Sequence, residues 1–417
     1  MDFAPELLEL GARAQAAARR LAFAATAEKN RALRELAAAL PRAEDEILAA
    51  NALDLAQAAE KGLPPVLSDR LALTPQGIRA MARAAEEVAD LPDPVGGGEF
   101  WTRPNGLKIE KTRVPLGVIA IIYEARPNVT TDAAALCLKA GNACVLRGGS
   151  EALQSNLVLA RLIGAAVESA GLPAGCVQLL PWSERVYAEQ LMRLDRYIDV
   201  LIPRGGAALI QNVARNATVP VIETGTGVCH AFVDAAADMD KAIRVVVNAK
   251  TNKPAVCNAL ETVLVHRAAA AVFLPRLAAE FQAAGVEMRG CAETRALIPA
   301  AAEATEEDWS AEYGGLIISI RVVADLDEAL DHIYRYGTKH SETILTEDYS
   351  AAQRFLRETD AAAVYVNAST RFTDGGRFGF GAEIGISTQK LHARGPMGLA
   401  ELTTVKYVVY GDGHIVT

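Results

Sequence analysis

The chain has 417 residues, of which 51% are hydrophobic, so it is long enough for two or more domains with substantial cores. Its formal net charge of −9 gives no overall electrostatic footprint for nucleic acid, and we expect no nucleic-acid partner. Six scattered cysteines without a CxxC pair favour a reducing compartment. Because no uncharged apolar run reaches the roughly 18 residues of a membrane span and the first ten residues lack a basic start, we expect a cytoplasmic protein without a membrane partner.

The first part of the chain, up to about Asp90, is rich in Ala, Leu, Glu and Arg and is predicted to be helical. One apolar stripe recurs there at helical spacing on a charged background: Leu33, Leu36, Ala37 and Leu40. The Pro/Gly-rich stretch at 91–98 ends this region. Residues 107–114 then alternate apolar and charged side chains, as a half-solvated strand does.

Strands and helices alternate in the middle of the chain, from Pro115 to Glu223. Helices are predicted at 153–170 and 184–194, and short apolar runs rich in β-branched residues predict the strands: Val118–Ile122, Ala143–Leu146, Val177–Leu180, Tyr197–Ile202 and Val219–Ile222. This alternation predicts an α/β fold with a parallel, doubly wound sheet.

A second α/β set begins near Val228. Asp325, with Glu328 three residues later, is predicted to cap a helix over 329–334. The last strand-like piece, 404–410, has no partner nearby in sequence, so it pairs either with the early strand or with another subunit. The strand candidates of this second set are Glu261–Val265, Leu316–Ile320, Thr343–Leu345 and Ala363–Val366.

Two predicted strands end in glycine-containing loops that open helices. Glycine lets the backbone approach a phosphate, and a helix N-terminus offers unpaired N–H groups to it. Either arginine of these loops could meet the 2′-phosphate that distinguishes NADP from NAD. No GxGxxG fingerprint is present, and the same pattern also fits two ordinary turns with solvated arginines, so both readings stay open. The loops are Arg147-Gly148-Gly149-Ser150 and Arg204-Gly205-Gly206.

Among the cysteines, Cys257 has the most suggestive surroundings, a polar loop with Lys250 and Lys253 just before a strand. Nearby cations lower a thiol pKa and favour the nucleophilic thiolate, although a half-buried structural thiol fits the same position. Cys229 precedes His230, but adjacent strand residues point to opposite faces and make a poor nucleophile–base pair. The spacings of Cys and His match no metal-ligand pattern, so we expect no metal.

Read together, these segments resemble the aldehyde dehydrogenase superfamily and, within it, the enzymes that reduce an acyl phosphate. The resemblance rests on five separated motifs in the same order: Val114–Ile119 with Tyr123–Thr130, Gly141–Ala143 with Arg147–Gly149, Ile202–Gly206, Cys257–Thr262, and Phe378–Lys390 continuing through His392–Pro396.

The resemblance implies an aldehyde dehydrogenase-like fold of two doubly wound α/β domains plus a β oligomerisation ribbon. Residues 1–98 and 118–227 would form the NADP-binding domain, and residues 228–399 the catalytic domain. Residues 99–117 and 400–417 would form the ribbon and its C-terminal strand. The implied reaction converts L-glutamyl 5-phosphate and NADPH to L-glutamate 5-semialdehyde, NADP and phosphate, the second step of proline biosynthesis.

The resemblance also implies roles for single residues. Cys257 maps onto the nucleophile and Asn128 onto the oxyanion-hole asparagine. The two glycine loops named above would bind the cofactor, together with Glu223 and Glu312. Glu223 occupies the place of the general base of hydrolytic relatives, and Glu312 resembles the glutamate that holds the nicotinamide ribose, although Glu312-Tyr313-Gly314-Gly315 departs from the usual Glu-x-Phe-Gly-Pro. The leaving phosphate or the substrate carboxylate would bind one of two arginines, Arg126 or Arg377.

The implied assembly is a homodimer or homotetramer. A transient complex with glutamate 5-kinase is chemically attractive, because glutamyl phosphate cyclises easily. Two alternatives belong to other classes: a hydrolytic NAD(P)-dependent aldehyde dehydrogenase, and a nucleotide-binding regulatory protein with an idle thiol. Phosphate-dependent oxidation of the semialdehyde would exclude the first, and rapid alkylation of Cys257, with protection by substrate, would count against the second.

Overall fold

A computed structural model describes residues 3–416, so residues 1, 2 and 417 of the expected domains lie outside the described part. The chain divides into two compact units, and each is treated by itself. The first comprises the chain up to Thr224, Gly379–Gly385 and the chain from Met397 onward, and the second comprises Gly225–Phe378 and Ile386–Pro396. No helix of the described residues is long and apolar enough to cross a membrane.

The first unit opens with helices, as predicted. They are α1 (Pro5–Leu21), α2 (Thr26–Arg42), α3 (Glu44–Glu60), α4 (Pro65–Leu71) and α5 (Pro75–Asp90). The apolar stripe of α2 is buried at all four of its predicted positions. This burial confirms that the 3.6-residue periodicity marks the face that packs inward.

A parallel four-stranded sheet forms the core of the first unit, with the strand order β5-β4-β3-β6. Its strands are β3 (Val118–Tyr123), β4 (Ala143–Arg147), β5 (Val177–Leu179) and β6 (Val200–Arg204). One face packs against α1, α8 (Arg185–Leu191) and α9 (Ala207–Asn216), and the other against α6 (Asn128–Lys139) and α7 (Leu153–Ser169). All six residues of β3 are buried, as expected for a central strand covered on both faces.

Two strand predictions in this unit were inaccurate. β6 begins at Val200 rather than at Tyr197, because the Tyr197 N–H donates to the Leu194 oxygen at 3.0 Å and closes a turn. The predicted strand 219–222 is reduced to a single bridge between Val221 and Leu201. Pro220, which lacks an N–H, contributes only its carbonyl to the Leu201 N–H.

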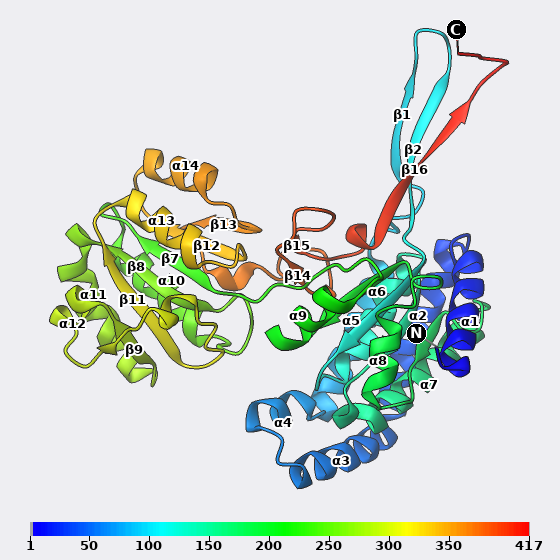
Figure 1. Ribbon diagram of the computed structural model, residues 1–417, viewed down its shortest axis with the longest axis horizontal. Coiled ribbons are helices and arrows are strands. Elements are labelled where there is room, and N and C mark those ends of the chain that lie inside the picture. Colours follow the sequence, from blue (N-terminus) through cyan, green and yellow to red (C-terminus); the bar gives the residue numbers. More distant parts are fainter. Residues whose placement is uncertain (1–2, 417) are drawn as a thin grey trace. The chain divides into compact units, whose positions relative to one another are not determined.

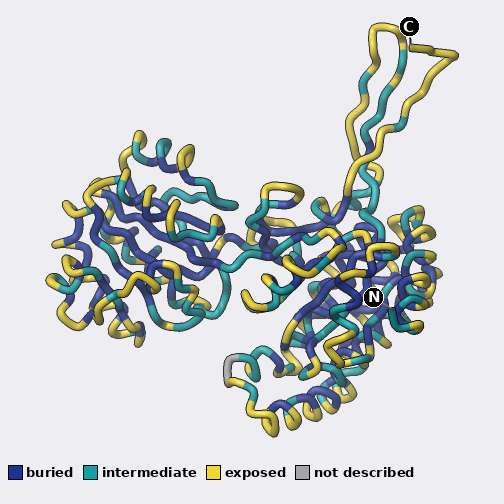
Figure 2. Tube along the Cα trace, viewed as in Figure 1, coloured by how far each residue is buried: buried dark blue, intermediate teal, exposed yellow. Residues whose placement is uncertain are grey.

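A long antiparallel ribbon also belongs to the first unit (Figure 1). It has the order β1-β2-β16 and joins β1 (Gly98–Thr102), β2 (Lys108–Pro115) and β16 (Thr403–Tyr410). The C-terminal strand therefore pairs with the early strand of its own chain, one of the two predicted possibilities. Figure 2 shows that the ribbon is largely exposed, whereas the strands of the sheets are buried.

The second unit is built on a seven-stranded parallel sheet with the order β10-β9-β11-β8-β7-β12-β13. Its strands are β7 (Cys229–Val233), β8 (Leu260–His266), β9 (Glu287–Gly290), β10 (Ala302–Glu303), β11 (Ile317–Val323), β12 (Ser341–Leu345) and β13 (Ala363–Val366). The helices α10 (Met239–Thr251) and α11 (Arg267–Ala283) pack on one face, and α13 (Leu326–Tyr336) and α14 (Tyr349–Glu358) on the other.

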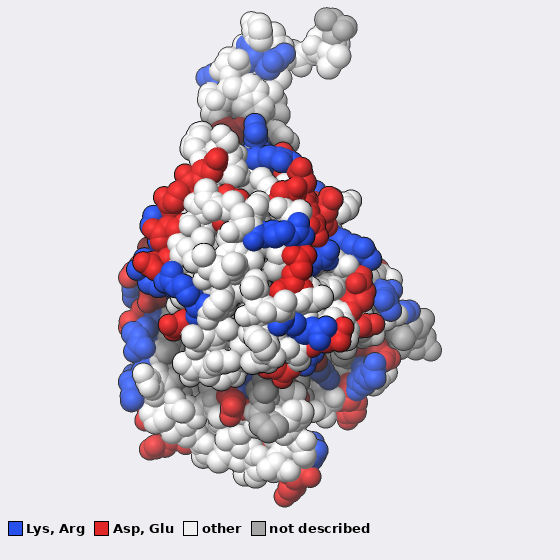
Figure 3. Space-filling model, turned by 90° about the vertical axis from the view of Figure 1, so that its left-hand side faces the viewer, with Lys and Arg blue, Asp and Glu red and all other residues white. Residues whose placement is uncertain are grey.

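Asp325 caps α13 as predicted, since its carboxylate accepts the Glu328 N–H at 3.0 Å. Both units are thus doubly wound α/β structures, which confirms the predicted fold class. Figure 3 shows acidic and basic side chains mixed over the face that it presents.

Candidate active site

Cys257 lies in the loop between α10 and β8, at the amino edge of the second sheet. The segment just before β7 packs against its backbone. A Cβ atom on Gly227 would lie 1.4 Å from the Cys257 oxygen, so only glycine fits at position 227. The Cys229 thiol donates to the same oxygen at 3.3 Å. Cys257 itself is half-buried, whereas burial raises the pKa of Cys229 well above its usual range.

The residue after the cysteine, Asn258, ties this loop to the 3₁₀ turn η3 (Thr370–Phe372). Its amide donates to the Thr373 oxygen at 2.7 Å, and its own carbonyl accepts from the Thr370 hydroxyl at 2.8 Å. Its side-chain oxygen accepts a hydrogen bond from Nη1 of Arg371. Asn258 is 3% exposed, so these bonds hold the backbone beside Cys257 away from water.

Arg371 is a site residue that sequence reasoning missed. Burial lowers the pKa of its guanidinium and the neighbouring Arg377 lowers it further, whereas Asp374 and the Cys257 and Cys229 thiols raise it. Its only sequence signal is an arginine among small polar residues after a strand. Arg371 lies 113 residues beyond Asn258, and only the folded chain brings the two together.

Lys250 is not a free cation beside the thiol, contrary to the prediction. Its Nζ lies 2.5 Å from the Glu261 carboxylate, and both side chains are almost fully buried. Burial raises the pKa of Glu261 to about 7 and lowers that of Lys250. The opposite charge of each partner acts against these shifts: Lys250 lowers the pKa of Glu261, and Glu261 raises that of Lys250. Glu261 also accepts the Gly314 N–H at 3.3 Å, which positions the loop of the exposed Glu312.

In the first unit, Asn128 opens α6 and its side-chain amide donates to the Asp132 carboxylate at 3.0 Å. Burial raises the pKa of Asp132 to about 6, and Asn128 and Arg204 lower it. The Asn128 amide therefore points along the helix toward Asp132, four residues later. Asn128, Asp132 and Arg204 therefore form one local group at the carboxyl ends of β3 and β6.

The two glycine loops follow β4 and β6, on either side of β3. In this strand order the chain changes direction across the sheet between β3 and β6, the place where doubly wound sheets bind dinucleotides. A Cβ on Gly148 would lie 2.1 Å from the Asn156 amide nitrogen, so the backbone packs closely there. The Gly206 N–H, at the start of α9, already holds an anion, the Glu124 carboxylate, at 3.0 Å.

The half-buried Arg147 donates to the Ser183 oxygen at 3.2 Å and interacts electrostatically with Glu151 and Glu124. Glycine loops with a basic side chain and a helix N-terminus suit a phosphate group. In this structure Glu124 and Glu151 interact with these positive groups, so a phosphate would have to displace them.

The predicted site residues fall in both units. Cys257, Glu312 and Arg377 belong to the second unit, where Arg377 is exposed and lies near Arg371. The remaining predicted residues belong to the first unit: Arg126, Asn128, Arg147, Gly148, Gly149, Ser150, Arg204, Gly205, Gly206 and Glu223.

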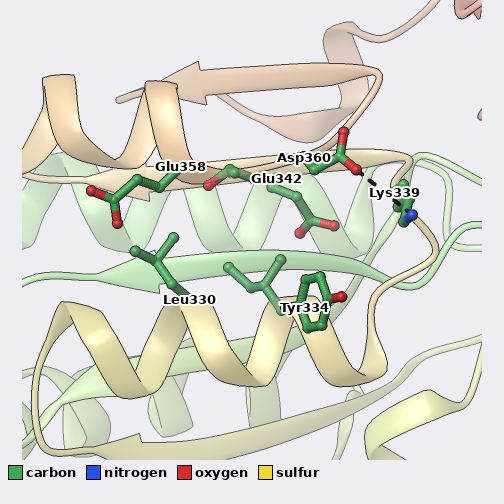
Figure 4. A pocket seen from close by; sticks show the side chains of 8 residues that line it. Leu330, Tyr334, Lys339, Glu342, Glu358 and Asp360 are labelled. Atoms are coloured by element: carbon green, nitrogen blue, oxygen red, sulfur yellow. Dashed lines mark ion pairs between the residues drawn. The ribbon is translucent and has the colours of Figure 1, made fainter. Parts of the chain in front are cut away.

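A small pocket in the second unit lies away from this chemistry. It has a volume of about 30 Å³, room for roughly two water molecules. Figure 4 shows Leu330 and Tyr334 of α13 and Glu342 of β12 around it, and the Cys257 loop does not line it. The Glu342 carboxylate is fully buried and lies 3.0 Å from Nδ1 of His230, a pair that links β12 to β7.

The sequence profile of the aldehyde dehydrogenase family matches residues 6–307. A gamma-glutamyl phosphate reductase of Desulfitobacterium hafniense is 65% identical over 417 residues, and one of Moorella thermoacetica is 60% identical over 416, each covering 100% of both chains. The crystal structure of the gamma-glutamyl phosphate reductase of Thermotoga maritima superposes with a TM-score of 0.96 at 51% identity, covering 99% of this chain and 100% of the other.

The chain belongs to the gamma-glutamyl phosphate reductases. Members of this family are oxidoreductases of the aldehyde dehydrogenase type, which use NAD or NADP and act on a small molecule. The full-length similarity does not favour the hydrolytic alternative.

Proposed function

We propose that the chain reduces L-glutamyl 5-phosphate with NADPH to L-glutamate 5-semialdehyde, releasing NADP and phosphate, as the second step of proline biosynthesis. The observation that carries this proposal is the 65% identity over the full length to a relative named for that reaction. The firmly held loop of Cys257 supports it, because a nucleophile must be presented in a fixed position.

Cys257 is the proposed nucleophile. Its thiolate attacks the acyl carbon and forms a C–S bond, and the proposed oxyanion donor is the side-chain amide of Asn128. The C–O bond to phosphate then breaks, and phosphate leaves with the electron pair. When bound, NADPH supplies a hydride to the resulting thioester. Cleavage of the C–S bond then releases the aldehyde and returns the Cys257 thiolate.

NADPH is the proposed cofactor, held by the two glycine loops: Arg147, Gly148, Gly149 and Ser150, and Arg204, Gly205 and Gly206. Arg147 and Arg204 are both candidates for the 2′-phosphate, and each lies near a carboxylate: Glu151 for Arg147 and Asp132 for Arg204. Glu312 is proposed to hold the nicotinamide ribose. Glu223 is grouped with the cofactor and has no general-base role in this scheme, because no water is activated.

We also propose a role for each part of the chain. Residues 1–98 and 118–227 are proposed to bind NADP, residues 228–399 to carry the nucleophile, and residues 99–117 with 400–417 to form the oligomer interface of a homodimer or homotetramer. A cytoplasmic location and a transient complex with glutamate 5-kinase complete the proposal. Arg126 and Arg377 are the anion-binding candidates from the sequence.

An assay of NADP reduction with L-glutamate 5-semialdehyde, with and without inorganic phosphate, tests the function. We expect turnover only with phosphate, since phosphate must attack the thioester in this direction. Turnover that is independent of phosphate would instead indicate a hydrolytic enzyme.

The cofactor preference is tested with Arg147→Ser. The variant should raise the KM for NADPH at least tenfold and leave that for NADH nearly unchanged, because only NADPH has the 2′-phosphate. Equal losses with both cofactors would remove Arg147 from that role.

A further inference from the structure

Arg371 is a buried cation with unused hydrogen-bonding capacity. It is 6% exposed, and within the described part of the chain its Nε has no hydrogen-bond partner. The other end of the guanidinium, Nη1, donates to Asn258. Burying a guanidinium without a full set of acceptors is costly, so an arginine in this position favours an anionic ligand.

The surroundings of Arg371 place that ligand near the nucleophile. Asn258, its hydrogen-bonding partner, is the residue directly after Cys257, and the Arg371 guanidinium interacts electrostatically with the Cys257 thiol. A second guanidinium, that of Arg377, is close enough to repel it. Two like charges kept together beside a thiol are stabilised when an anion binds between them.

We propose that Arg371 and Arg377 bind the phosphoryl group of the acyl phosphate beside Cys257, an inference that rests on the function proposed above. The phosphorus lies two bonds from the carbon that the thiolate attacks, whereas the α-carboxylate carbon lies four bonds away. A cation tied to the residue after the nucleophile is therefore suited to the nearer anion. As the C–O bond breaks, negative charge grows on the departing phosphate, and the two guanidinium groups stabilise it.

Other residues also hold η3 against Asn258. Thr370 and the Thr373 carbonyl already fix Asn258 without it. A merely structural arginine would change stability with no preference between substrates, and this difference decides the experiment.

The test is the oxidative assay on full-length Arg371→Gln, with the KM for inorganic phosphate and for L-glutamate 5-semialdehyde measured separately. We expect the KM for phosphate to rise at least tenfold and that for the semialdehyde to change less than twofold. Arg321→Gln, on β11, is the control, because Arg321 is also partly buried and hydrogen-bonded but lies outside the Cys257 loop. Both constants should stay unchanged in the control.

A higher KM for the semialdehyde alone would assign Arg371 to the substrate carboxylate and overturn the inference while leaving the proposed function intact. Unchanged constants would also overturn it. A wild-type enzyme that needs no phosphate would instead refute the proposed function itself, and the inference with it.

A second readout does not depend on turnover. Inorganic phosphate should slow the alkylation of Cys257 by iodoacetamide in the wild type and fail to do so in Arg371→Gln. If that variant does not fold, Arg371→Lys and Arg377→Gln replace it, and each should weaken the protection by phosphate. Equal protection in wild type and variants would overturn the proposal.

Discussion

Cys257 differs from the other cysteines in what surrounds it. Its carbonyl is contacted by Gly227 and Cys229, and the residue after it is anchored to η3. The described structure places the cation of Arg371 near its thiol, while Lys250 is neutralised by Glu261. A half-buried thiol near a cation is the environment in which a thiolate forms near neutral pH.

Cys257→Ser should fold normally, bind NADPH and lose essentially all turnover, because a serine hydroxyl is far harder to deprotonate than a thiol. Cys291→Ser is the matched control, since Cys291 is also half-buried and its thiol contacts the Thr294 hydroxyl. Steady-state assays, with circular dichroism to check the fold, decide the matter. More than a few per cent of residual activity would show that Cys257 is not the nucleophile.

Asp132 predicts a pH dependence of stability. Burial raises the pKa of Asp132 in the folded chain from 3.8 to about 6. The protonated carboxyl therefore contributes fully to the free energy of unfolding below about pH 3.8, and this contribution is lost as the pH rises through 6. Asp132→Asn removes this loss. The free energy of unfolding of the variant, relative to wild type, should therefore increase by on the order of 2 kcal/mol between pH 4 and pH 7.5. Urea unfolding at the two pH values measures it, and a difference that does not change with pH would contradict the prediction.

At the scale of elements, local periodicity predicted most of what is observed. The stripe of α2, the cap at Asp325 and the buried strand β3 follow from side-chain patterns within a few residues. Arg371 could not be found this way, because its partner is 113 residues distant and no local pattern encodes that contact. The pairing of Lys250 with Glu261 was missed for a related reason, since a sequence shows a lysine's charge but not its burial.

An alanine substitution at Gly148 tests the close packing of the first glycine loop, and one at Gly164 is its control. In Gly148→Ala the new methyl group would meet the amide of Asn156, which is 1% exposed and accepts a hydrogen bond from Thr130. We expect a loss of about 2 kcal/mol of stability and a higher KM for NADPH. Gly164→Ala, inside α7 with nothing within 4 Å of the new Cβ, should instead add about 1 kcal/mol. Thermal melting of the two variants should shift in opposite directions, and a stabilised Gly148→Ala would refute the close packing.

At the scale of the whole molecule, the ribbon exposes apolar side chains. Its strand pairing puts directly opposed residues on one face, and that face combines five apolar side chains (Trp101, Ile109, Val405, Tyr407 and Val409) with three charged ones (Glu99, Lys111 and Arg113). Tyr407 is 60% exposed and Val409 54%, although Trp101 packs edge-on against Tyr407. Several large apolar side chains that stay exposed on one ribbon are typical of an interaction surface, which supports the proposed oligomer.

Tyr407→Glu should weaken self-association, because it replaces a large exposed apolar side chain with a carboxylate that an interface would have to desolvate. Light scattering should show a smaller assembly at concentrations where the wild type associates. Lys406→Glu is the matched control, since the neighbouring residue of the same strand points to the opposite face. Both variants should leave the melting temperature of the single chain unchanged, because neither side chain belongs to a core. If the mass of the Tyr407→Glu assembly is unchanged, or if Lys406→Glu reduces the mass equally, the face that carries Tyr407 is not the interface.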